Sequence, residues 1–202
     1  MDHGLIFYWI AWLCWVWVTW MMNKDRQRLK WAVILLIAVI LSNRQFDVFD
    51  LTVQATLFVW LISGFYELTK LPLFYQIYLC LLSLISAMGY ISLFLFAIYD
   101  PVWVIVPFHW ICSGYLFLFS LVFVKSFLHR LLWLLLSISV GEIGVGIILN
   151  NLGLQQQIGT DGYLDRLAMA FCGIVIFHYF QRFVQMMEDF VEKIKAERRN
   201  VI

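Results

Sequence analysis

The amino-acid sequence predicts an all-α protein, a polytopic transmembrane helix bundle of about seven spans with its N-terminus outside the cell and its C-terminus inside. Two observations on composition predict this class. Hydrophobic residues make up 63% of the 202-residue chain and charged residues only 13%, whereas soluble domains have about 45–50% and about 25%. The mean hydropathy is +0.86. A soluble enzyme, a nucleic-acid-binding protein and a small disulfide scaffold are excluded, because such a chain cannot cover itself with polar side chains.

Seven apolar stretches are the predicted helices of one transmembrane domain, residues 1–184. They lie near residues 4–22, 29–42, 51–66, 73–99, 102–124, 131–149 and 167–184. A helix needs about 20 apolar residues to cross a hydrocarbon core of about 30 Å. The stretches are continuously apolar rather than alternating, which excludes a transmembrane β-barrel.

Two stretches, 29–42 and 51–66, are shorter than a full crossing. We expect both to span, through snorkelling of flanking cations such as Arg44 or through a helical extension over 46–49. A re-entrant hairpin is the alternative, but it would bring charged side chains near the midplane at a cost of about 3 kcal/mol each. The first stretch, 4–22, has no basic segment before it and is expected to remain as a span rather than be cleaved.

The basic residues orient the chain. With the N-terminus outside, the inner connections are 23–30, 67–72, 125–130 and the tail from residue 181. They hold all of the 14 Lys and Arg residues except Arg44 and Arg166, which fall in outer connections. Such an excess of cations on one side predicts that this side faces the cytoplasm.

The tail, residues 185–202, is predicted to form a cytoplasmic amphipathic juxtamembrane helix. Its apolar side chains fall on one helical face, namely Met187, Phe190, Val191 and Ile194. One interpretation is a helix that lies on the inner surface of the bilayer. The other is a docking helix for a membrane or cytoplasmic protein partner. The two heptads of the tail are too short to predict a coiled coil.

One polar site is predicted inside the apolar stretches. Glu142 is the one acidic residue within them, about 10–12 Å below the outer end of its helix. His109 lies at a similar depth, and the two side chains could form a proton-exchanging pair if their helices face each other. Ser139 and Ser113 are the other candidates for this proton or ligand site, and Pro107 is expected to bend the helix beside His109. The alternative is that Glu142 is satisfied by packing alone.

Known catalytic and metal-binding motifs are not found. There is no His-Glu-x-x-His or Gly-x-Ser-x-Gly sequence, and the four cysteines are spread one to a stretch. They are expected to be small buried hydrophobic residues rather than metal ligands or disulfide partners. We therefore expect a protein that is not an enzyme, with no catalytic residues, no metal site and no cofactor.

Three features of the sequence occur together: the aromatic opening Phe7–Trp15, the basic loop Asn23–Lys30 and the layout of the whole chain. In these features the chain resembles the small YphA-type membrane proteins of spore-forming bacilli. The resemblance implies a location in the bacterial cytoplasmic membrane. It contributes no catalytic residues, because that family is functionally uncharacterised.

Three classes of function remain open, the least favoured being an intramembrane enzyme that acts on lipid or peptide. The tail helix and the lack of catalytic motifs favour an accessory, scaffold or interaction protein, with the lipid bilayer and a further protein as partners. The alternative is a small proton-coupled carrier that uses Glu142 with His109. Against the carrier, the chain has no detectable inverted repeat of the kind that transporters commonly contain.

The orientation gives a testable prediction. Alkaline phosphatase fused after residue 202 should be inactive, and a green fluorescent protein fused there should fluoresce, because the tail is expected in the cytoplasm. The same two reporters after Gly153, in an expected outer loop, should give the opposite pair of results. Phosphatase activity from the fusion at residue 202 would contradict the predicted topology.

Overall fold

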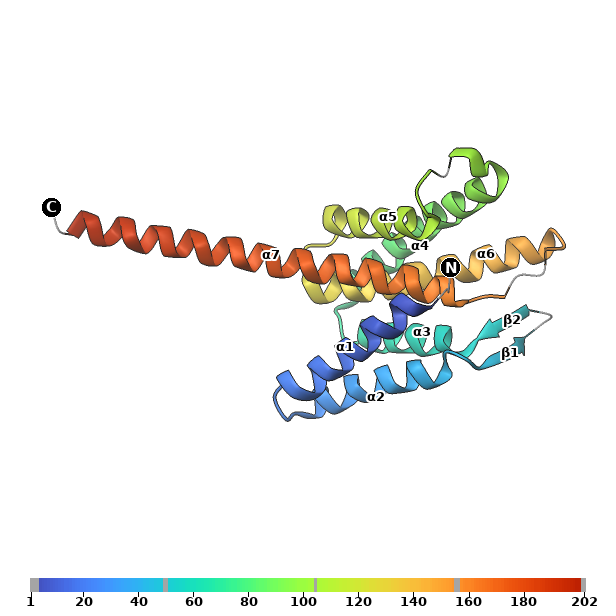
Figure 1. The fold of residues 1–202 in the computed structure, drawn as a ribbon, viewed down its shortest axis with the longest axis horizontal. Helices are drawn as coiled ribbons and strands as arrows, with labels where there is room; N and C mark the ends of the chain where they lie inside the picture. The colour runs from blue at the N-terminus through green and yellow to red at the C-terminus, as the bar shows by residue number, and fades with distance from the viewer. Residues whose placement is uncertain (1–3, 49–50, 104, 155–156, 201–202) are drawn as a thin grey trace.

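The computed structural model describes residues 4–48, 51–103, 105–154 and 157–200, and these residues form seven α-helices (Figure 1). The α-helices are α1 (Leu5–Met21), α2 (Arg26–Leu41), α3 (Ala55–Leu68), α4 (Leu73–Tyr99), α5 (Phe108–Phe123), α6 (Phe127–Asn151) and α7 (Asp161–Asn200). Shorter elements are the strands β1 (Gln45–Val48) and β2 (Leu51–Gln54) and the 3₁₀ turn η1 (Pro101–Trp103). The predicted all-α class is confirmed.

Three of the helices are long and apolar enough to cross a membrane: α4, α6, and α7 from Asp161 to Glu192. The helices α1, α3 and α5 are also apolar but shorter. Many large apolar side chains on the outside of the bundle are exposed, for example Trp9, Ile85 and Val122. An apolar exterior of this kind suits a surface that contacts lipid rather than water.

The bundle is organised around α6. This helix packs against α3, α4, α5 and α7, and it carries the longest series of buried residues. Trp133 is fully buried and stacks on Phe119 of α5, with ring centroids 5.4 Å apart and planes 7° apart. Further along the helix Gly141 faces Tyr90 of α4, where a Cβ would lie 2.7 Å from a ring carbon. Glycine at this position therefore lets α4 and α6 approach closely.

Between α2 and α3 the structure differs from the prediction. Residues 46–49 were expected to extend a helix and 51–66 to form one, but β1 and β2 pair antiparallel, with Gln45 opposite Gln54, and α3 begins at Ala55. Ile158 of the connection between α6 and α7 joins the hairpin, accepting a hydrogen bond from Gln54 N at 2.9 Å and donating one to Thr52 O at 2.8 Å. Alternating polar and apolar residues with β-branched Val and Thr favour this extended backbone.

The start of α5 also differs. The stretch 102–124 was expected to be one helix bent at Pro107, but η1 ends at Trp103 and α5 begins at Phe108. Pro107 occupies the position just before the first helical residue. A proline is tolerated at the first positions of a helix because its missing N–H has no partner there in any case.

At the C-terminal end, one helix replaces the two that were expected. The stretch 167–184 and the described part of the tail, 185–200, belong to α7, which runs 40 residues from Asp161 to Asn200 and is therefore about 60 Å long. Figure 1 shows its C-terminal half projecting well beyond the bundle. No proline interrupts it, and its tail is rich in Glu, Lys, Gln and Met, which are good helix formers. Arg166, expected in an outer loop, lies in the second turn of this helix.

The first helix is held to α7 by a carboxylate. Asp165 is buried and accepts hydrogen bonds from the backbone N–H groups of Gly4, at 2.7 Å, and Phe7, at 2.9 Å. These two donors have no partner within α1 because they lie at its N-terminus. Asp165 therefore acts as an N-cap supplied by another helix.

This contact predicts a stability effect. Asp165→Ala should lower the free energy of unfolding by about 3 kcal/mol, because it leaves two buried N–H groups unpaired. The measurement is unfolding in detergent micelles, with Asp189→Ala on the exposed part of α7 as the control, which should change little. Equal stability of the two variants would contradict the capping role.

Candidate functional site

A buried ion pair lies where the three longest apolar helices meet. Glu142 of α6 accepts a hydrogen bond on Oε2 from Arg166 Nη2 of α7 at 3.0 Å. The same oxygen accepts a hydrogen bond from Tyr90 Oη of α4 at 2.6 Å. Glu142 is 3% exposed, Arg166 7% and Tyr90 0%. One carboxylate oxygen thus joins the three helices that are long enough to cross a membrane.

Arg166 is surrounded by aromatic rings. Its guanidinium carbon lies 5.7 Å from the ring centroid of Tyr90, 5.6 Å from that of Phe94 and 5.9 Å from that of Phe108. Cation–π contacts of this kind strengthen when water is excluded. They offset part of the cost of burying the cation, and Glu142 supplies the opposite charge. Within the described residues, Arg166 Nε has no hydrogen-bond partner.

The two predicted serines lie beside this pair rather than in it. Ser139 Oγ is 2.9 Å from Tyr163 Oη, and Ser113 Oγ donates to the backbone carbonyl of Arg166 at 3.0 Å. Both bonds connect α7 to a neighbouring helix, α6 in the first case and α5 in the second. They hold the segment that carries Arg166 in place.

His109 is not brought to Glu142. It lies in the first turn of α5, half-buried, with its ring centroid 6.2 Å from that of Trp110. The hydrogen bonds of the Glu142 carboxylate go to Tyr90 and Arg166. The neighbouring Phe108 is the residue of α5 that faces the guanidinium. Since successive residues of a helix point about 100° apart, His109 points in a different direction from Phe108.

Tyr90 and Arg166 are the residues that sequence reasoning missed. Tyr90 sits in an uninterrupted apolar stretch and gives no local signal. Arg166 could have been found, because a carboxylate buried near the outer end needs a cation and only Arg44 and Arg166 were assigned to that side. Because each apolar stretch was ended at the nearest charged residue, Arg166 was placed in a loop rather than in the last helix.

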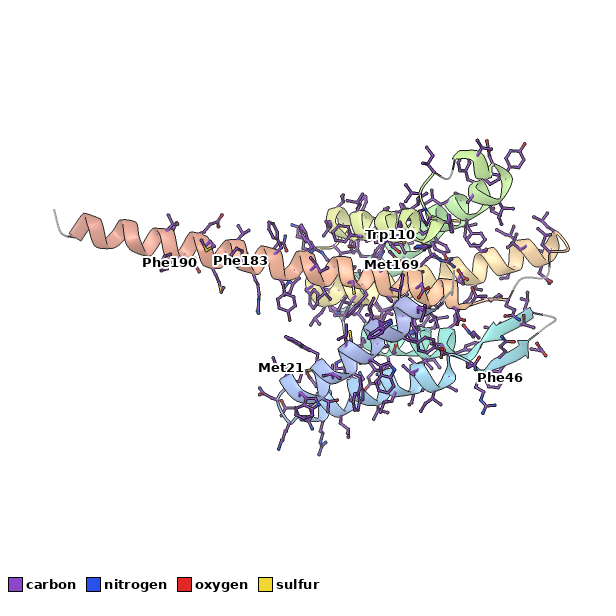
Figure 2. All side chains as sticks on the ribbon, viewed as in Figure 1. Met21, Phe46, Trp110, Met169, Phe183 and Phe190 are labelled. Atoms are coloured by element: carbon purple, nitrogen blue, oxygen red, sulfur yellow. The ribbon has the colours of Figure 1, made fainter. Side chains whose placement is uncertain are left out.

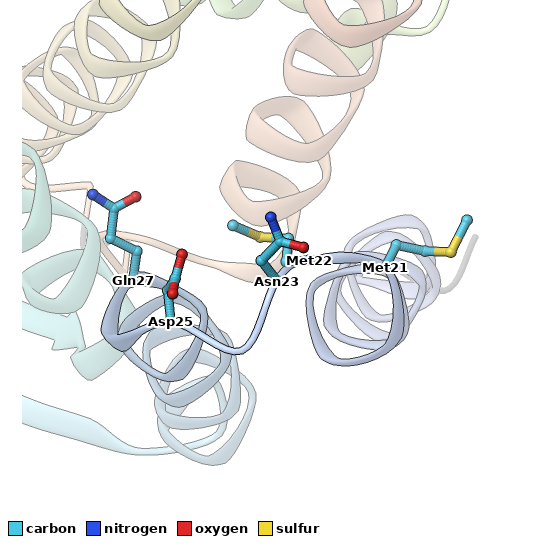
Figure 3. Close-up of a pocket in the computed structure, with 5 residues that line it drawn as sticks. All are labelled: Met21, Met22, Asn23, Asp25 and Gln27. Atoms are coloured by element: carbon cyan, nitrogen blue, oxygen red, sulfur yellow. The ribbon is translucent and has the colours of Figure 1, made fainter.

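The surface pockets lie elsewhere. One of about 300 Å³ sits at the turn between α1 and α2 (Figure 3), and its lining residues are Met21, Met22, Asn23, Asp25 and Gln27. Another, of about 220 Å³, is on α1, lined by Leu5, Tyr8, Trp9 and Trp12. In the described residues, no group of three or more His, Cys, Asp or Glu side chains is placed to hold a metal ion.

An exposed ionic cluster lies at the turn between α3 and α4. Glu67 is bonded to Lys30 of α2 and to Lys70, the latter at 2.9 Å. Both ammonium groups also lie over the ring of Tyr66, at 4.3 Å and 4.5 Å. The hydrogen bond to Glu67 raises the pKa of Lys70 above its ordinary value. The cluster ties α2 to the α3–α4 turn and keeps an excess of positive charge there.

The predicted docking residues lie on the projecting part of α7. Met187 is 49% exposed, Phe190 60% and Val191 45%. Figure 2 shows Phe183 and Phe190 on this segment, beyond the end of the bundle. The side chain of Ile194 lies outside the described residues.

Comparison with known proteins identifies a family that the chain matches over nearly its whole length. The model of the family described as YphA-like integral membrane protein matches residues 3–200. The chain is also 21% identical over 194 residues to the "Uncharacterized protein YphA" of Bacillus subtilis (strain 168), an alignment that covers 96% of this chain and 94% of that protein. No solved structure matches.

A double-mutant cycle tests the coupling between Glu142 and Arg166. Glu142→Gln and Arg166→Met should each destabilise the bundle by about 3–5 kcal/mol, because each leaves the other charged or polar group buried without its partner. The double variant should cost clearly less than the sum of the two. Unfolding in detergent measures all three, with Lys70→Met as an exposed control. Additive costs would show that the two residues do not act as a pair.

Proposed function

The chain belongs to the family of YphA-like integral membrane proteins, and on that premise we propose that it is an accessory or scaffold protein of the bacterial cytoplasmic membrane. It acts by binding another protein chain rather than by catalysis or transport. The observation that carries this proposal is the continuation of α7 beyond the bundle with exposed apolar side chains. Asp165, Arg166 and the Ser113 hydrogen bond hold the first turns of that helix against its neighbours.

The proposal includes seven crossings, with the N-terminus outside and the C-terminus in the cytoplasm. Successive helices run in alternating directions along the bundle (Figure 1). The lysines and arginines near the start of α2 and at the α3–α4 turn lie at the end from which α7 projects. This common end is the one that the positive-inside rule places in the cytoplasm. The short helices α2, α3 and α5 require local thinning of the bilayer or snorkelling of flanking cations.

The length of α7 separates it into two parts. A hydrocarbon core of about 30 Å takes about 20 residues of helix, so a crossing that begins at Asp161 ends near Gln181. The residues from there to Asn200 extend about 28 Å further at 1.5 Å per residue. Phe183, Met187 and Phe190 then stand in water, 56%, 49% and 60% exposed. Exposed apolar surface of this kind on a rigid element is typical of a binding surface.

The carrier that the sequence also allowed has no comparable support. Its two residues, Glu142 and His109, are not brought together, and both hydrogen bonds of Glu142 go to side chains of the bundle. A proton-exchanging carboxylate needs access to a proton donor that can come and go. Here the hydrogen-bond donors to the Glu142 carboxylate are Tyr90 and Arg166, and Arg166 is held among aromatic rings.

Substitutions on α7 test the proposal. The paired change Met187→Ser with Phe190→Ser should abolish the assemblies that an amine-reactive crosslinker captures in native membranes. Gln185→Ser with Glu192→Ser, on the polar face of the same segment, is the matched control and should leave them intact. Both variants should unfold like the unsubstituted protein, because all four substituted side chains are exposed. Assemblies that survive the first pair of changes would overturn the proposal.

A further inference from the structure

One apolar stripe on α7 passes from the bundle into the projecting segment without a break. It consists of Ile176, Phe180, Phe183, Met187 and Phe190, which are 69%, 60%, 56%, 49% and 60% exposed. The spacing alternates between four and three residues and so averages 3.5. That average is the period at which two helices wind around each other in a left-handed coiled coil. The stripe spans about two heptads, which are too few to predict a coiled coil by themselves, so any pairing also depends on the exposure and position of the stripe.

The stripe faces away from the rest of the chain. The opposite side of α7 packs inward: Ile174 is fully buried, and Phe177 meets Phe117 of α5 at 6.0 Å between ring centroids. His178 stacks on Phe127 of α6, with centroids 4.3 Å apart and planes 20° apart. The face that carries Ile176 and Phe180 is therefore left uncovered by the described part of the chain.

Lipid can cover only part of this stripe. Ile176 and Phe180 lie within the crossing, but Phe183, Met187 and Phe190 follow the straight helix out of the hydrocarbon core. A partner that covers the whole stripe must offer a helix that is embedded in lipid at one end and in water at the other. The α7 helix of a second copy satisfies both conditions, because every copy inserts with the same orientation.

We propose that α7 pairs in parallel with α7 of a second copy of this chain, along the stripe from Ile176 to Phe190. Two-fold symmetry about an axis along the membrane normal brings the stripe against itself, the usual geometry of a homodimer. This rests on the proposed function, in which α7 is the binding element, and it names the partner. The polar positions Gln181, Gln185 and Glu192 remain on the outside of the pair.

The area available suits a stable contact. Aromatic side chains bury about 150–250 Å² each when fully covered, and three of the five stripe residues are phenylalanines. Tyr179, Val184, Met186 and Val191 flank the stripe and are also exposed. A standard protein interface buries about 800 Å² on each partner, and the nine exposed apolar side chains of the stripe and its flanks are the surface available for such a contact.

Disulfide trapping in isolated membranes tests the pairing. Phe183→Cys, Met187→Cys and Phe190→Cys are introduced singly into a chain whose four native cysteines are replaced by alanine, and two differently tagged copies are co-expressed. The controls are Gln185→Cys and Glu192→Cys on the opposite face. Upon mild oxidation the stripe positions should give a product of twice the 23.9 kDa chain mass that carries both tags. Its yield should be several-fold higher than from the controls, because only the stripe brings two Cα atoms within disulfide reach.

A second measurement keeps the native cysteines and so avoids a folding defect of the cysteine-free chain. A photoreactive phenylalanine analogue at position 190 should crosslink the two tagged copies, and the same analogue at position 192 should not. Equal yields from both faces, or no product that carries both tags, would overturn the pairing. If position 190 instead crosslinks to a different protein, the pairing fails while the proposed function stands. If neither position finds any protein, both fail.

Discussion

The architecture depends on one electrostatic constraint, the neutralisation of Glu142 inside an apolar bundle. An unpaired carboxylate at this depth would cost several kcal/mol. The cation comes from Arg166 on the next helix, and Tyr90 adds a hydrogen bond from a third. Gly141 lets the tyrosine approach, since any larger residue would collide with its ring. A single charge thereby fixes how α4, α6 and α7 sit against one another.

The same pair sets the position of α7 along its own axis. Arg166 must lie at the depth of Glu142, so the helix has to begin above it, at Asp161. Asp165, the adjacent residue, points to a different side and caps α1. Because Arg166 and Asp165 hold the N-terminal end of α7, the surplus length of the 40-residue helix emerges at its other end. The projecting segment is therefore a consequence of the buried charges near the opposite end.

Local signals in the sequence were sufficient wherever the chain has sharp boundaries. The predicted stretch 73–99 coincides with α4 because Pro72 and Pro101 flank an unbroken apolar run. Glu142 was also predicted from a local signal, because it is a charged residue within an apolar stretch. Its partners were not, because Tyr90 and Arg166 are 52 and 24 residues away and their proximity comes from helix packing. The expected helices were also bounded by charged residues. For this reason the start of α7 at Asp161 and its continuation into the tail were not predicted.

The chemistry of the pair argues for a rigid support rather than a moving part. A carrier must change the protonation or the partner of its central carboxylate during each cycle. Protonating Glu142 would leave the Arg166 cation in a dry site with only the three aromatic rings to stabilise it, and breaking buried pairs in this way costs several kcal/mol. Both charges are instead satisfied by residues of the bundle itself. A core locked in this manner transmits little motion, but it can hold a long helix at a defined position and angle. That is the requirement of a protein whose working surface is an extension of its last membrane helix.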